Sequence, residues 1–125
     1  MIKNLACLVF LVSVASVSNA QLSNSKWKGT LKIENDVNVS FEFGKDTLKV
    51  FNLADNSIIE TMTYTATNST FTINKISGQS DCDNAAPGKY KYETKQDALL
   101  ITLLEDTCED RSSVLKSLEL SKNPE

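Results

Sequence analysis

Hydrophobic and polar residues alternate along most of the chain beyond residue 26, with the period of two that is typical of strands with one buried face. The strictest run is Val37–Phe43, in which four apolar residues share one face and three polar residues share the other. No segment shows sustained helical spacing. The pattern predicts an all-β chain with strands over residues 27–33, 37–43, 47–53, 58–67, 70–76, 89–94, 98–104 and 114–120.

Most connections between these strands are short and have the composition of tight turns, such as Gly44-Lys45-Asp46 and Gln96-Asp97. Two are longer: the polar segment 77–87 and the charged segment 105–111. An eight-stranded antiparallel up-and-down meander closes most naturally into a barrel, because closure removes the exposed edges. We therefore predict one barrel domain over residues 21–125. Its interior is either filled by side chains or holds one small ligand, and the pattern leaves both open.

Residues 1–20 have the features of a secretory signal peptide. Lys3 precedes an apolar run from Leu5 to Val17, and the small residues Ser18 and Ala20 stand at the positions that a signal peptidase requires. The run is shorter than a transmembrane helix needs. We expect cleavage after Ala20, a secreted or periplasmic chain, and no stable membrane anchor after cleavage.

Three cysteines occur, and one of them, Cys7, lies in the predicted signal peptide. Removal of that segment leaves Cys82 and Cys108, an even pair in an exported chain, for which a disulfide is expected. Both fall in connections that follow odd-numbered strands, the fifth and the seventh, so the meander places them at the same end of the barrel. Their pairing is therefore geometrically allowed. Two cysteines without other soft ligands predict no metal site.

Composition limits the chemistry that this chain can perform. It has 13 Lys and Arg, 16 Asp and Glu, and no histidine. The absence of histidine excludes Ser-His-Asp and Cys-His nucleophiles and His-ligated metals. The acidic excess argues against nucleic-acid binding. Nothing places the carboxylates Glu60 and Glu93 at a glycosidase separation, and no glycine-rich phosphate loop occurs. We predict a protein that is not an enzyme and carries no cofactor.

Acidic residues concentrate in the connections that follow the odd-numbered strands. These connections contain a single arginine, Arg111, and nine acids: Glu34, Asp36, Asp55, Asp81, Asp83, Glu105, Asp106, Glu109 and Asp110. Such a rim would attract a cationic ligand, a hard cation such as Ca²⁺ or a basic protein partner. The plainer interpretation, which we favour, is a set of solvated loops on the protein surface.

Two basic side chains are candidates for binding a ligand in the barrel mouth. Arg111 could fork onto a ligand carboxylate, or it could pair with Asp106 or Asp110 and hold the loop. Lys116 shares alternation parity with apolar residues of the last predicted strand, which places it on the inward face near the mouth. The alternative for Lys116 is that the strand twists or bulges and the amine reaches water.

The three tyrosines, Tyr64, Tyr90 and Tyr92, are the remaining candidates for a ligand cavity. Each has an apolar ring and a hydroxyl that needs a hydrogen-bond partner when it is buried. Trp27, at the start of the first strand, is expected to close the opposite end of the barrel as core.

Three short motifs give the chain a family resemblance: Trp27–Thr30, Gly88–Tyr92 and Asp106–Arg111. With these motifs the chain resembles small bacterial lipocalin-like proteins of the calycin type. The resemblance implies an eight-stranded barrel that binds a small apolar or amphipathic molecule in its mouth. The chain is shorter than typical lipocalins, and its Trp27 precedes Gly29, whereas the lipocalin motif has Trp after Gly. The alternative function is a filled barrel that binds a protein partner, such as an enzyme to be inhibited, through acidic loops.

Overall fold

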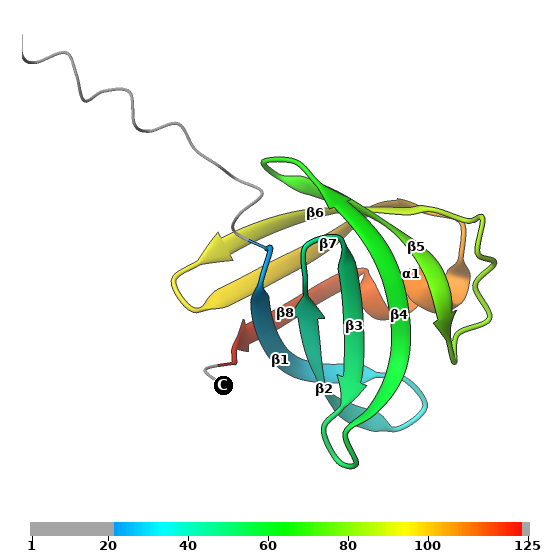
Figure 1. Ribbon diagram of the computed structural model, residues 1–125, viewed down its shortest axis with the longest axis horizontal. Coiled ribbons are helices and arrows are strands. Elements are labelled where there is room, and N and C mark those ends of the chain that lie inside the picture. The colour runs from blue at the N-terminus through cyan, green and yellow to red at the C-terminus, as the bar shows by residue number, and fades with distance from the viewer. Residues whose placement is uncertain (1–21, 124–125) are drawn as a thin grey trace, which may run out of the picture.

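The computed structural model describes residues 22–123, which form eight strands and one short helix (Figure 1). The elements in chain order are β1 (Ser25–Lys32), β2 (Asp36–Phe43), β3 (Thr47–Asn52), β4 (Ser57–Ala66), β5 (Thr70–Gly78), β6 (Gly88–Lys95), β7 (Ala98–Asp106), α1 (Glu109–Leu115) and β8 (Ser117–Lys122). Each predicted strand corresponds to an observed one, although several bounds differ by a few residues. The all-β prediction is confirmed.

The strands form a closed antiparallel barrel in which each strand pairs with the next along the chain and β1 pairs with β8. The closing pair is short, with Trp27 opposite Lys122 and Lys28 opposite Ser121. Gly29 allows close packing beside this seam, because a Cβ there would lie 2.4 Å from Cδ2 of the buried Leu120. The predicted up-and-down barrel is confirmed.

Alternating residues face the barrel interior, as the sequence pattern predicts. On β2, Val39, Phe41 and Phe43 are buried in the core while Asn38 is exposed. Trp27 is also buried in that core, as expected. The inward side chains of all eight strands contribute to one hydrophobic cluster.

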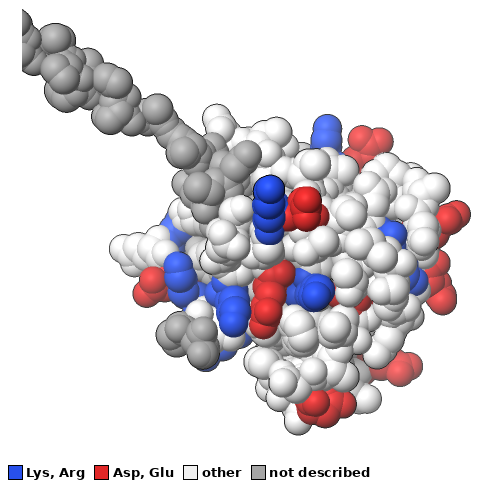
Figure 2. All heavy atoms as spheres, in the orientation of Figure 1, with Lys and Arg blue, Asp and Glu red and all other residues white. Residues whose placement is uncertain are grey.

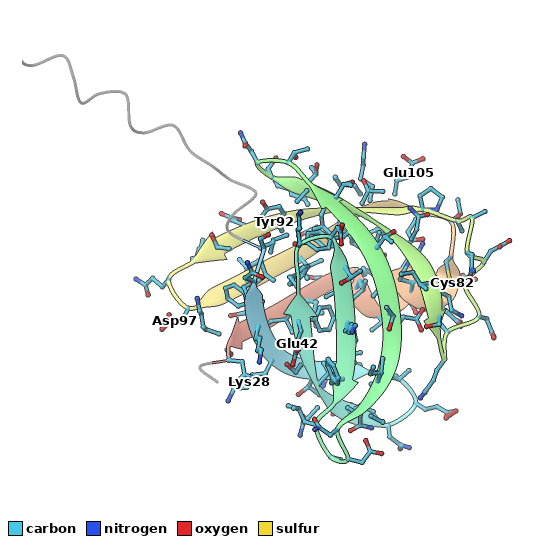
Figure 3. The ribbon with its side chains drawn as sticks, viewed as in Figure 1. Lys28, Glu42, Cys82, Tyr92, Asp97 and Glu105 are labelled. Atoms are coloured by element: carbon cyan, nitrogen blue, oxygen red, sulfur yellow. A yellow bond between two sulfur atoms is a disulfide. The ribbon has the colours of Figure 1, made fainter. Side chains whose placement is uncertain are left out.

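The barrel has two structurally different ends. The β2–β3, β4–β5 and β6–β7 turns and residues 22–24 lie at one end, here called the closed end. The β1–β2, β3–β4 and β5–β6 connections and α1 lie at the other, here called the mouth. Asp97 in the β6–β7 turn and Cys82 in the β5–β6 connection mark these opposite ends (Figure 3). The long polar connections are therefore gathered at the mouth, as the meander predicts.

The predicted structure of residues 105–120 is wrong in one respect, because the segment contains the helix α1. Residues 105–111 were expected to form a loop and residues 114–120 a strand, but α1 occupies Glu109–Leu115 and β8 begins at Ser117. Seven residues make only two turns, which is too short for a helical period to stand out. The local signals are Glu109 and Asp110 in the first turn, where the helix dipole favours acids.

The predicted signal peptide, residues 1–20, lies outside the described residues. Within residues 22–123, no helix has the length and apolar character needed to cross a membrane. Leu22, directly before β1, is fully buried and belongs to the core cluster. Burial of the core therefore begins at the first described residue.

Candidate functional site

A cavity of about 510 Å³ lies at the mouth of the barrel. Its lining combines inward residues of β1–β4 with residues of the β5–β6 connection and of α1. Apolar side chains predominate and include Leu31, Phe41, Val50, Ile59, Met62 and Leu115. Seven polar side chains also line it, among them Ser80 and the charged Lys32, Glu60, Asp110 and Arg111. The mouth thus has a cavity of the kind that the hollow alternative requires.

A buried ion pair stands beside this cavity. The Arg111 guanidinium forks onto Asp106, with Nε donating to Oδ2 at 2.7 Å and Nη2 donating to Oδ1 at 2.7 Å. Asp106 also accepts hydrogen bonds from the Tyr90 hydroxyl and, at 2.9 Å, from the backbone N–H of Cys108. Arg111 Nη2 further donates to the carbonyl oxygen of Ala86 at 2.7 Å. These bonds connect β6, β7, α1 and the β5–β6 connection.

The hydrogen bonds determine how the cluster titrates. Burial alone would raise the pKa of the Asp106 carboxyl, but the bonds from Arg111, Tyr90 and Cys108 outweigh it and lower that pKa below its ordinary value. The bond to Asp106 raises the pKa of Arg111, although burial opposes the change. Burial first, and the bond to Asp106 second, raise the pKa of the Tyr90 hydroxyl far above its ordinary value. Asp106 and Arg111 are therefore held as a carboxylate and a guanidinium whose charges cancel.

Gly88 makes room for this cluster at the start of β6. A Cβ at that position would lie 2.4 Å from Asp106 Oδ2 and 3.0 Å from Arg111 Nη2. Two of the three motifs behind the lipocalin-like resemblance, residues 88–92 and 106–111, thus meet in one structural cluster. Their first role is to fix the wall of the mouth.

A disulfide fixes the same wall from outside. Cys82 and Cys108 are bonded, with Cα atoms 5.4 Å apart, which confirms the predicted pairing. The bond joins the β5–β6 connection to the residue that precedes α1. Nearby, the backbone N–H of Asp81 donates to Asp110 Oδ2 at 3.0 Å. The connection and α1 therefore form one cross-linked side of the mouth.

The sequence left two roles open for Arg111, a ligand contact and a pair within the loop. The structure shows the pair, because the guanidinium binds Asp106. It also lines the cavity and is only 5% exposed. Its Nη1 is buried and has no hydrogen-bond partner among residues 22–123. A buried donor of this kind is costly to leave unsatisfied. Contact between Arg111 and a ligand thus remains a prediction, restricted now to the Nη1 amino group.

The three tyrosines lie in the core and use their hydroxyls within the protein. Tyr64 donates to the Gly44 carbonyl at 2.6 Å, Tyr92 donates to the Thr67 carbonyl at 2.8 Å, and Tyr90 donates to Asp106. Burial raises the pKa of both the Tyr64 and the Tyr92 hydroxyl. None of the three lines the described cavity. Their contact with a ligand stays a prediction that this placement does not support.

Two of these tyrosines help to fill the closed end. Phe43 packs edge-on against Tyr64 and Phe71, with ring centroids 5.2 and 6.1 Å apart, and Phe71 packs against Tyr92 at 5.9 Å. These four residues are here called the aromatic cluster. Edge-to-face contacts of this kind are a preferred aromatic geometry. They occupy the interior at the end opposite the cavity.

The predicted inward position of Lys116 is wrong. Lys116 is exposed at the C-terminal end of α1, and β8 begins only at the next residue. The alternation that placed it inward extended a strand through a segment that is helical. Lys116 does not line the described cavity.

Glu60 is a site residue that the sequence reasoning did not single out for binding. It lines the cavity, is 7% exposed, and accepts hydrogen bonds from Ser80 N at 3.1 Å and from Ser80 Oγ at 2.5 Å. A signal was available, because Glu60 shares strand parity with the buried Met62 and Tyr64. A carboxylate on an inward face needs partners.

The surface around the mouth is both acidic and apolar. Figure 2 shows acidic side chains along its right-hand edge, where Figure 1 places α1 and the β5–β6 connection. No group of three or more acids or cysteines within the described residues could hold a metal ion. Large apolar side chains, between 43 and 50% exposed, lie in the mouth halves of the strands or in the mouth connections: Ile33, Leu53, Ile58, Ile76 and Leu104. Of these, Ile33 also lines the cavity.

Comparison with known proteins gave no match to a protein family, a curated protein or a solved structure. The closed eight-stranded antiparallel barrel is compatible with a calycin-like fold. The resemblance to lipocalin-like proteins thus rests on this architecture and on the short motifs.

Proposed function

We propose that the protein is an exported, lipocalin-like carrier that binds a small apolar or amphipathic molecule in the mouth of its barrel, without catalysing a reaction. The observation that supports this most is the cavity of about 510 Å³ at the mouth. Small-molecule sites typically have volumes of about 300–1,000 Å³, with apolar walls and a few polar groups. The mouth has this combination.

The disulfide supports the export that the proposal includes. Cys82 and Cys108 are bonded, and such bonds persist in oxidising compartments but are rare in the cytosol. The predicted signal peptide over residues 1–20 gives a route to such a compartment. Cleavage would free the chain shortly before Leu22, which is fully buried.

The cavity at the mouth favours the carrier over the alternative, a filled barrel that binds a protein partner. Binding of a basic partner by the acidic connections remains a separate prediction. It is tested by the salt dependence of any complex, since contacts between exposed charges weaken as salt screens them.

Titration calorimetry with octan-1-ol, a small uncharged amphiphile, tests the proposal. Saturable binding is expected, and Val50→Phe should weaken it because the larger side chain projects into the cavity. The matched control is Lys49→Phe, at the neighbouring exposed position, which should leave binding unchanged. Absence of saturable binding, or equal binding by the two variants with the barrel intact by circular dichroism, would refute the proposal.

A further inference from the structure

The cavity wall contains a buried acid without a basic partner. Glu60 is 7% exposed, and within residues 22–123 no lysine or arginine nitrogen forms an ion pair with it. Its position is built into the fold: a Cβ on Gly78, which has a φ of +141°, would lie 2.2 Å from Glu60 Oε1. A buried carboxylate is costly unless it is paired and hydrogen-bonded. Ser80 supplies hydrogen bonds, but the counter-charge is missing.

The basic groups near Glu60 have other partners. The amine of Lys75 donates to the Ser80 carbonyl at 2.5 Å and forms no ion pair with Glu60 among residues 22–123. Arg111 is neutralised by its two bonds to Asp106. The amine of Lys32 contacts Asp36 Oδ2 at 3.4 Å, and the Lys32 side chain is 76% exposed. An anionic headgroup would therefore be repelled by the Glu60 carboxylate, which forms no ion pair with any of these cations.

The surroundings of the mouth favour a positive ligand as well. Asp110 also lines the cavity, and Asp81, Asp83 and Glu109 are exposed in the adjoining connection and helix. The cavity lining itself carries the bases Lys32 and Arg111 beside the acids Glu60 and Asp110, so the negative excess lies in the exposed acids at the entrance. An acidic entrance concentrates cationic ligands. The acidic residues at the entrance and the buried Glu60 therefore both favour a positively charged ligand.

We infer that the cavity binds an amphipathic amine, with its ammonium group paired to Glu60 and its apolar chain against Phe41, Val50 and Met62. The inference rests on the proposed function and names its ligand class. The buried Nη1 of Arg111 adds a second element, because it can donate to an uncharged oxygen of the ligand, such as a hydroxyl or carbonyl. A carboxylate ligand, which Arg111 alone would suggest, is disfavoured by the Asp106 pair.

Three ligands with the same chain test this inference by calorimetry at pH 7: octylamine, octan-1-ol and octanoate. Octylamine is expected to bind about tenfold or more tightly than octan-1-ol, because a hydrogen bond between charged groups is stronger than a neutral one. Octanoate should bind most weakly. Glu60→Gln should reduce octylamine affinity to about that of octan-1-ol, since the amide keeps the shape but removes the charge.

The matched control is Glu93→Gln, the same exchange at an exposed position of β6. It should preserve the wild-type order of affinities, and thermal unfolding should show both variants to be folded. If the wild type binds octanoate as tightly as octylamine, or if folded Glu60→Gln retains the preference for amine, the inference is overturned. If it is overturned while octan-1-ol still binds, the proposed function stands. If no octyl compound binds, the proposed function fails as well.

Discussion

The closed end and the mouth are built from the same strands with the same alternation, yet one is filled and the other is hollow. At the closed end the inward side chains include the aromatic cluster of Phe43, Tyr64, Phe71 and Tyr92. At the mouth the inward side chains include the smaller Val50 and leave a cavity of about 510 Å³. Alternation therefore decides which face is inside, while side-chain size decides whether the inside can hold a ligand. The wall of the mouth, where Phe41 lines the cavity, is held by a disulfide and a buried ion pair.

The largest expected effect comes from breaking that ion pair. Asp106→Asn leaves Arg111 buried without a counter-charge, which should lower the free energy of unfolding by about 3–5 kcal/mol. Denaturant unfolding measures the change. The control Asp36→Asn breaks the exposed pair with Lys32 and should cost less than about 1 kcal/mol. Equal costs for the two variants would mean that the ion pair does not support the mouth.

Removal of the disulfide should have the next largest effect. Replacing Cys82 and Cys108 with serine opens a loop of 26 residues, and the expected loss of stability is about 3 kcal/mol. Hydrogen exchange should accelerate most in α1 and the β5–β6 connection, and least around the aromatic cluster. Uniform acceleration along all strands would contradict a separate role at the mouth.

One substitution made at both ends compares their packing directly. Leu48 is fully buried away from the cavity, whereas Leu31 lines it. Leu48→Ala creates a new void and Leu31→Ala enlarges an existing one, so we expect Leu48→Ala to cost about 2 kcal/mol more. Denaturant unfolding of the two variants gives the difference. A larger cost for Leu31→Ala would show that the mouth is as tightly packed as the closed end.

The smallest expected effect is the loss of folding stability at acid pH that comes from protonation of Asp106. The pKa of Asp106 is lowered in the folded protein, so its contribution to stability is fully present above its ordinary value of 3.8 and is lost as the pH falls below that value. Unfolding measured between pH 5 and pH 2 should show a steeper loss for the wild type than for Asp106→Asn. Parallel curves would mean that Asp106 is not the group that titrates.

Much of the fold follows from the sequence because its signals are local and repetitive. Eight alternating segments joined by short turns predict the meander, and the meander places Cys82 and Cys108 at one end, where they are bonded. The helix α1 was missed because seven residues carry too little periodicity to compete with an adjacent strand pattern. Lys116 was misplaced for the same reason.

The site was harder to predict than the fold because it depends on which partners meet in three dimensions. Alternation identifies Tyr64 and Tyr92 as inward residues but cannot show that backbone carbonyls accept their hydroxyl protons. The Arg111 fork was foreseen as one of two alternatives, and only the fold decides that Asp106 receives it. Glu60 could have been recognised from its parity with Met62, although its lack of a basic partner could not.

The central claim is that a small amphiphile binds at the mouth while the closed end remains a packed support. Amide chemical-shift mapping by NMR during titration with octan-1-ol tests this claim most directly. We expect saturable shifts in α1, in the β5–β6 connection and in the mouth halves of β1–β4, with none in the β2–β3, β4–β5 and β6–β7 turns. Shifts confined to those turns, or no saturable shifts anywhere, would contradict it.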